Sequence, residues 1–167
     1  MDDFSRSLVE AMQFENDGYH HYTTAAQRTE DPKAKQMFGQ LAEDELSHHK
    51  TLELMFADHQ KQGSLKLKPP RIKSKVDPAQ ESPIFSPEFK ERVGDKHYEM
   101  SALSIGILLE QNSIEGYKNY RRQAKELKIK RLFNALIRWE ELHLEALIKQ
   151  QQFLQTSYWE ANRFAPF

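Results

Sequence analysis

A pattern of glutamate and histidine residues occurs twice in this chain, at a constant offset of 95 residues and without a gap. Between residues 11–55 and 106–150, nine of the 45 pairs are identical, against about three expected from average residue frequencies. The pairs that carry chemistry are Glu15/Glu110, Tyr22/Tyr117, Glu45/Glu140 and His48/His143. Each copy therefore contains one Glu and, further along, a Glu-x-x-His motif. Four carboxylates and two imidazoles in two-fold arrangement form a donor set for a pair of metal ions.

Apolar residues recur every three or four positions in four long segments, which predicts four amphipathic helices. We expect these helices over about residues 3–28, 32–62, 95–127 and 128–157. Asp31 before Pro32 is a typical helix start, and Gly63 suits a helix end. Residues from about 63 to 94 contain five prolines and cannot form a long helix. The predicted fold is all-α: a four-helix bundle made of two helical hairpins joined by a long central crossover.

Length and composition exclude several classes of protein. A chain of 167 residues predicts a single domain over residues 1–167. The net charge of −1 gives no general reason to bind nucleic acid or an anionic membrane, and no apolar stretch approaches the ~20 residues that span a bilayer. The absence of cysteine excludes disulfides, thiolate metal sites and iron–sulfur clusters within this chain. Because the first residues do not resemble a signal peptide, we expect a cytoplasmic location.

The repeated polar residues lie on the apolar stripes of the predicted helices. Glu15 stands between Met12 and Tyr19, and the other repeated Glu and His residues are flanked by Leu or Ile in the same way. A carboxylate in a dry core costs several kcal/mol unless it is compensated, and four facing one another would also repel. Two divalent cations would balance them. The predicted metal ligands are Glu15, Glu45, His48, Glu110, Glu140 and His143.

This donor set suits iron or manganese and also accepts zinc; redox activity would favour iron. Tyr22 and Tyr117 each follow a predicted ligand Glu by seven residues, two helical turns along the same face. We expect their hydroxyls to hydrogen-bond a ligand carboxylate; the alternative is an ordinary buried tyrosine that bonds elsewhere. The remaining histidines have no histidine counterpart in the repeat, and we expect them at the surface or around the site: His20, His21, His49, His59 and His97.

Two segments lie outside the repeat. Residues 66–75 of the central linker are rich in Lys and Arg, which is typical of a solvated linker; the alternative is a patch that binds a partner. Residues 158–167 form an aromatic-rich tail, which we expect to pack on the bundle or on a second subunit.

Two stretches and their repeat counterparts resemble a known family. FENDGYHHY (14–22) and FGQLAEDELSH (38–48), with residues 110–117 and 133–143, are similar to the ferritin-like superfamily of di-iron carboxylate proteins and, within it, to the rubrerythrin-like family. The resemblance covers the four helices but not the linker or the tail. It implies a ferritin-like bundle that binds two iron ions, with Glu45 and Glu140 as bridging candidates and Glu15 and Glu110 as terminal ones. It also implies oxidation of a diferrous centre by hydrogen peroxide or dioxygen, protection from oxidative stress, and a homodimer.

The sequence departs from this family at two points. Rubrerythrins usually carry a rubredoxin domain, but this chain has no cysteine, so an external electron-donor protein is expected. The family also has an additional glutamate one turn after the ligand of the third helix, where this chain has Ser113. Three hypotheses follow: a di-iron peroxidase or oxidase, a ferroxidase or iron-handling protein, and a non-catalytic scaffold held together by metal.

Overall fold

The computed structural model describes residues 1–66, 74, 76 and 97–161, and these residues form four helices and no strand. The helices are α1 (Asp3–Arg28), α2 (Pro32–Gln62), α4 (His97–Gln123) and α5 (Leu127–Ala161). The prediction of an all-α four-helix bundle is confirmed. The helix α4 ends at Gln123, earlier than expected, and α5 continues to Ala161. Neither Gly nor Pro marks the turn between α4 and α5 in the sequence, so the position of this turn was not predicted closely.

Local sequence signals account for three helix ends. The side chain of Asp2 caps α1 by accepting a hydrogen bond from the backbone N–H of Ser5 at 2.7 Å. Asp31 caps α2 by accepting from the N–H groups of Lys33 and Ala34, and so satisfies donors that have no partner within the helix. At the other end of α2, Gly63 adopts φ = 66°, a left-handed conformation that glycine takes without a Cβ penalty.

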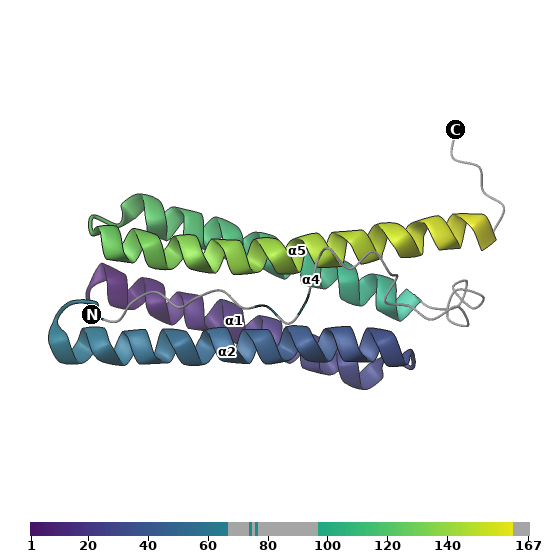
Figure 1. Cartoon of the computed structure of the whole chain (residues 1–167), viewed down its shortest axis with the longest axis horizontal. Helices are drawn as coiled ribbons and strands as arrows, with labels where there is room; N and C mark the ends of the chain where they lie inside the picture. The colour runs from purple at the N-terminus through teal and green to yellow at the C-terminus, as the bar shows by residue number, and fades with distance from the viewer. Residues whose placement is uncertain (67–73, 75, 77–96, 162–167) are drawn as a thin grey trace.

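The helices form two antiparallel hairpins, α1–α2 and α4–α5, which meet chiefly where α1 packs against α4 (Figure 1). Residues 63–96 connect the end of α2 with the start of α4, and these two points lie at opposite ends of the bundle. The adjacent helices α1 and α4 therefore run antiparallel, as do α2 and α5, whereas the diagonal pairs α1/α5 and α2/α4 run parallel. This order brings the middle of all four helices to one level.

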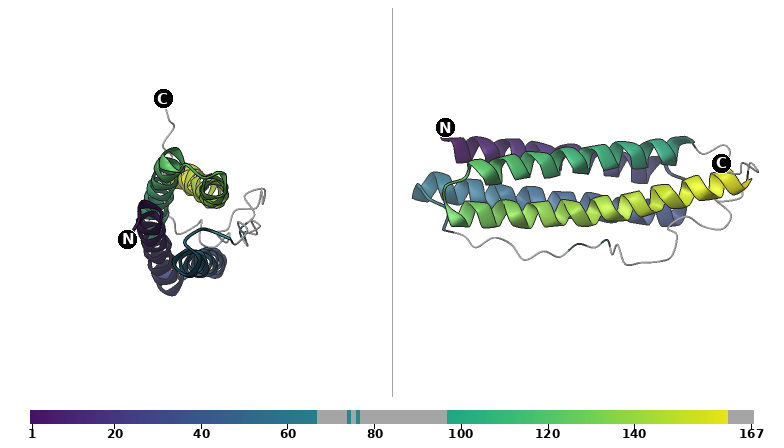
Figure 2. Two further views of the ribbon diagram at one scale, coloured as in Figure 1. Left: turned by 90° about the vertical axis from the view of Figure 1, so that its left-hand side faces the viewer. Right: turned by 90° about the horizontal axis from the view of Figure 1, so that it is seen from above.

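The side of the bundle formed by α2 and α5 is wider than the side formed by α1 and α4, as the end-on view in Figure 2 shows. Long side chains connect α2 and α5 across this side. Two described residues of the central connection lie here: Ser74 donates a hydrogen bond to Asp44 on α2 at 2.8 Å, and Val76 is buried in the core. Ser74 is thus attached to α2 at the level of the Glu-x-x-His motif.

The apolar core consists of two clusters, one towards each end of the bundle. One cluster includes Tyr22, Phe38 and Leu147, and the other includes Tyr117, Phe133 and Leu52. Phe38 and Phe133 are counterparts in the repeat, so the two halves build their cores from equivalent positions. The repeated Glu and His residues lie between the clusters, where they are shielded from water on both sides.

No helix in the described part of the chain is long and apolar enough to cross a membrane. The basic stretch of the linker lies almost entirely outside the described residues. Of the aromatic tail, Tyr158 and Trp159 lie at the end of α5 and are 37% and 44% exposed, so these two side chains do not pack into the bundle core.

Candidate metal centre

Each helix contributes to one buried polar cluster in the middle of the bundle. Glu15 comes from α1 and Glu110 from α4, and each Glu-x-x-His motif comes from α2 or α5. A spacing of three residues places a Glu and its His on the same face of a helix. All six residues of this cluster are at most 3% exposed: Glu15, Glu45, His48, Glu110, Glu140 and His143.

The six residues form two overlapping groups of four, and within each group the potential ligand atoms lie within 4.8 Å of one another. We name them by their histidines. The His48 position contains Glu15, Glu45, His48 and Glu140, and the His143 position contains Glu45, Glu110, Glu140 and His143. Only Glu45 and Glu140 occur in both groups, so these two carboxylates could bridge two ions.

Both histidines direct Nδ1 into the cluster. His48 Nδ1 lies 3.1 Å from Glu15 and 3.5 Å from Glu45. His143 Nδ1 lies 3.1 Å from Glu45 and 3.4 Å from Glu140. The two rings are stacked at 5.5 Å between centroids. Equivalent nitrogens from the two halves are therefore both available as metal ligands.

The two repeated tyrosines connect the hairpins at the level of the cluster. Tyr22 on α1 donates a hydrogen bond to Oε1 of Glu110 on α4, and Tyr117 on α4 donates to Oε1 of Glu15 on α1. Both tyrosines are fully buried. Each hydroxyl thus fixes a carboxylate that belongs to only one of the two groups.

Two glycines leave room for the side chains of this region. A Cβ at Gly18 would lie 3.1 Å from the Glu45 carboxyl carbon, and a Cβ at Gly106 would lie 3.0 Å from the Tyr22 ring. Such distances are shorter than ordinary van der Waals contact, so Glu45 or Tyr22 would have to move. The absence of a side chain at Gly18 therefore allows Glu45 to occupy the centre of the cluster.

The pKa values of Glu15, Glu45 and Glu140 are shifted. Burial, followed by repulsion from the other glutamates, raises the pKa of Glu45 and of Glu140 well above 4.5. Burial acts in the same direction on Glu15, but the adjacent His48 and hydrogen bonds outweigh it and lower its pKa to about 2. Burial lowers the pKa of His143, and hydrogen bonds to Asp44 and the glutamates more than compensate, so the net shift is upward. In the absence of a cation, the cluster therefore retains protons.

A pair of divalent cations fits the residues present. Both carboxylate oxygens of Glu140 are buried and lack a hydrogen bond of ordinary geometry among the described residues, although Nδ1 of His143 lies 3.4 Å from one of them. A buried carboxylate without a partner is costly, and a cation between Glu140 and Glu45 would satisfy it. The oxygen and imidazole donors suit iron or manganese.

Two residues beside the cluster were not identified from the sequence. Asp44 is 3% exposed, and its Oδ2 lies 3.4 Å from Nε2 of His143. Trp139 is 4% exposed, and its ring stacks on His48 with centroids 4.0 Å apart and an interplanar angle of 4°. They occupy equivalent positions, directly before Glu45 and Glu140. The repeat does not indicate them, because aspartate and tryptophan at these positions are not an identical pair.

The other sequence-predicted features are distributed around the bundle. Ser113 is buried and donates a hydrogen bond to Leu109 of its own helix. His21 bonds the backbone oxygen of Ala102, and His49 is partly exposed. The side chain of His97 lies outside the described residues.

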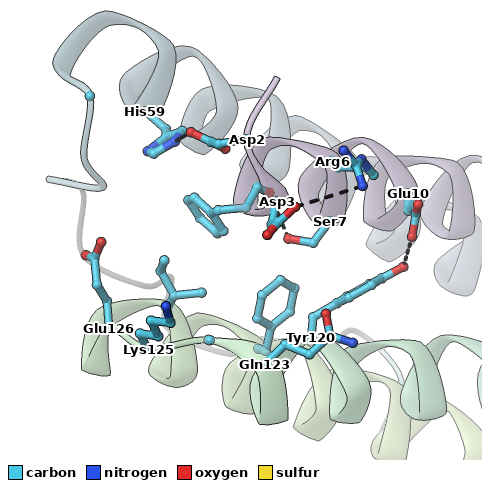
Figure 3. A pocket seen from close by; sticks show the side chains of 15 residues that line it. Asp2, Asp3, Arg6, Ser7, Glu10, His59, Tyr120, Gln123, Lys125 and Glu126 are labelled. Atoms are coloured by element: carbon cyan, nitrogen blue, oxygen red, sulfur yellow. Dashed lines mark hydrogen bonds and ion pairs between the residues drawn. The ribbon is translucent and has the colours of Figure 1, made fainter.

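His59 corrects the expectation that the remaining histidines lie at the surface or around the site. It is 8% exposed and contacts Asp2 at 2.8 Å at the end of the bundle. Its imidazole packs edge-on against the ring of Phe4. A histidine can therefore be accommodated on an apolar helix face at this position. Figure 3 shows that it belongs to a different region, a pocket of about 640 Å³ between the start of α1 and the α4–α5 turn. None of the six cluster residues lines this pocket.

The fold and the cluster define a class of protein: a four-helix bundle with a buried carboxylate–histidine cluster able to hold metal. A family model described as Rubrerythrin matches residues 6–151, which include all six residues of the cluster. The chain belongs to the rubrerythrin family. Comparisons with curated proteins and with solved structures give no match.

Proposed function

We propose that this protein is a non-haem di-iron oxidoreductase that reacts with hydrogen peroxide or dioxygen and receives electrons from an external donor protein. The observation that carries the proposal is the pair of overlapping groups that share Glu45 and Glu140. One ion would be held by Glu15 and His48 and the other by Glu110 and His143, with the shared carboxylates between them. When bound, two ferrous ions supply the two electrons that reduce one molecule of peroxide to water.

The residues of the chain have distinct tasks in this proposal. Glu45 and Glu140 give up their protons to the solvent as ions bind, because a cation replaces the proton as the partner of each carboxylate. Tyr22 and Tyr117 keep Glu110 and Glu15 in place while the charge at the centre changes. The apolar clusters on either side keep water away from the centre, which strengthens every electrostatic interaction within it.

The rate at which the bound Fe²⁺ is oxidised tests this proposal. Metal-free protein is loaded with Fe²⁺ under anaerobic conditions and mixed rapidly with hydrogen peroxide or with dioxygen, and the ferric absorbance is followed. We expect rapid oxidation in the native protein and none above the background of free Fe²⁺ in Glu45→Ala. A native protein that binds iron but oxidises it no faster than free Fe²⁺ would contradict the proposal and leave a metal that only stabilises the fold.

A ferroxidase is the second candidate, and Ser113 favours it. Ser113 bonds its own helix and brings no carboxylate to the position of the family's additional glutamate. The nearby Glu115 is exposed and pairs with Arg122 at 3.1 Å, so it does not replace that glutamate. Much faster oxidation by peroxide would support a peroxidase, whereas equal or faster oxidation by dioxygen would support a ferroxidase or oxidase.

A further inference from the structure

The two histidines of the cluster are contacted by different residues at the same position of the repeat. The offset of 95 pairs Asp44 with Trp139. Each reaches across the wide side of the bundle to the histidine of the other hairpin: Asp44 contacts His143, and Trp139 contacts His48. A position that is equivalent in the fold therefore offers an anion to one imidazole and an aromatic face to the other.

Asp44 prepares His143 to bind a cation. Its Oδ2 lies 3.4 Å from Nε2, while Nδ1 on the opposite side of the ring faces Glu45. Accepting a hydrogen bond from Nε2–H leaves the lone pair of Nδ1 directed into the cluster and increases its basicity. The negative charge of Asp44 also attracts a divalent ion at this position.

Asp44 is itself held in place by Ser74. Ser74 donates a hydrogen bond to Oδ2 of Asp44 at 2.8 Å, and the hydroxyl of Ser74 accepts from the N–H of Val76 at 3.1 Å. Val76 is buried in the core, so Ser74 is anchored from its other side. The carboxylate that supports His143 is therefore fixed before any ion binds.

Trp139 gives His48 a different kind of support. Its parallel ring restricts the plane of the imidazole, but it supplies neither a negative charge nor a hydrogen-bond acceptor. The indole Nε1 is buried and has no hydrogen-bond partner among the described residues. Trp139 thus restrains the orientation of His48 without selecting its tautomer.

We propose that Asp44 and Trp139 make the two metal positions unequal, so that the His143 position binds a divalent cation first and more tightly than the His48 position. Partners of this kind outside the ligand set typically change metal affinity ~10–100-fold, and we expect a difference of this size. The inference rests on the proposed function, because it requires two ions in the cluster. Its consequence is an ordered assembly, in which the ion beside Trp139 is added last and released first.

Calorimetric titration of the metal-free protein with Co²⁺ tests the order, with Co²⁺ as an air-stable substitute for Fe²⁺. Glu15 and Glu110 are repeat counterparts, each present in one position only, so Glu15→Gln and Glu110→Gln form a matched pair of variants. We expect two unequal steps in the native protein. Glu15→Gln should keep the tight step and lose the weak one, and Glu110→Gln should do the reverse.

The role of Asp44 is measured in the Glu15→Gln background, where only the His143 position remains intact. Asp44→Asn keeps the shape of the side chain and removes its charge, and it should weaken Co²⁺ binding ~10–100-fold. Glu43→Gln removes the same charge from the exposed neighbouring residue of α2 and should leave the affinity unchanged. Trp139→Phe in the Glu110→Gln background keeps a stacked ring, and it should change the affinity of the His48 position less than about threefold. Helix content from circular dichroism verifies that each variant is folded.

Equal affinities in Glu15→Gln and Glu110→Gln, or unchanged binding in Asp44→Asn, would overturn the inference and leave the proposed function intact. Tighter binding in Glu110→Gln than in Glu15→Gln would overturn it as well, because the order would be reversed. A native protein that binds no Co²⁺ at this cluster would overturn the proposed function and this inference with it.

Discussion

The two halves of the cluster have the same ligand types and differ in what supports their histidines. His48 and His143 are both buried, both direct Nδ1 inward, and both follow a shared carboxylate by three residues. Trp139 packs on the first, whereas Asp44 contacts the second. A repeat therefore preserved the residues that could touch metal while the residues directly before Glu45 and Glu140 differ. The similarity sets the chemistry of the site, and the difference distinguishes its two positions.

The largest effect on metal binding is expected for the two carboxylates that both metal positions share. Glu45 and Glu140 belong to both groups, so Glu45→Ala or Glu140→Ala should abolish binding of both ions rather than one. Loss of a direct ligand exceeds the ~10–100-fold effect of removing a residue outside the ligand set, so affinity should fall more than about 100-fold. Metal content after dialysis measures it. Glu141→Ala, at an exposed neighbouring position, is the control, and a variant that retains one full ion would show that the halves are independent.

Metal binding should stabilise the fold, and more so as the pH rises. The pKa values of Glu45, Glu140, His48 and His143 are all raised, the carboxyls by burial and repulsion and the histidines by adjacent carboxylates that outweigh burial. A raised pKa adds stability below the ordinary value of 4.5 or 6.5, and that stability is lost as the pH rises through the folded-state pKa.

The metal-free protein should accordingly lose stability from these groups as the pH rises above the ordinary values of 4.5 for the glutamates and 6.5 for the histidines, whereas ions replace the protons and bind more tightly as the pH rises. Measurements at a pH of about 5.5 and of about 7.5 compare the two conditions. At a free Co²⁺ concentration of ~100 times the dissociation constant, the gain is about 2.7 kcal/mol per site. Thermal unfolding with and without Co²⁺ at both pH values measures the difference. A stabilisation that decreases with pH would contradict the assignment of these residues.

The two tyrosines test whether equivalent hydrogen bonds in the two halves contribute equally to the free energy of unfolding. Tyr22→Phe removes the donor to Glu110, and Tyr117→Phe removes the donor to Glu15. Each change leaves a buried carboxylate without its hydrogen bond, and each should lower the free energy of unfolding by about 1–3 kcal/mol. Urea denaturation of the two metal-free variants compares them directly. A difference well above 1 kcal/mol would show that the asymmetry extends beyond Asp44 and Trp139.

The smallest expected effect concerns two glycines of the first hairpin. A Cβ at Gly39 meets no atom within 4 Å, so Gly39→Ala should stabilise the protein by about 0.5–1 kcal/mol through helix propensity alone. Gly18→Ala should gain less or nothing, since its Cβ would press on Glu45, and it should weaken Co²⁺ binding. Chemical denaturation and titration of both variants separate the two effects. Unchanged Co²⁺ binding in Gly18→Ala would mean that Glu45 has space to adjust.

Periodicity predicted the helices, and the 95-residue repeat together with periodicity predicted the cluster. Apolar positions at helical spacing indicated four helices, and Glu15 or Glu140 stood out because they interrupt an apolar stripe. Asp44 and Trp139 could not be found in this way. They are not identical to each other, and their roles depend on contacts across the wide side of the bundle. His59 was misplaced because its burial results from packing of helix ends, which periodicity does not describe.

We propose that one chain holds a pair of ions between its two hairpins, and anaerobic titration with Fe²⁺ tests this most directly. The bound iron is counted per chain as the ion is added. We expect saturation at two Fe²⁺ per chain, one for each overlapping group, and no bound iron in Glu45→Ala. Saturation at one ion or fewer in the native protein, or full iron content in Glu45→Ala, would contradict it.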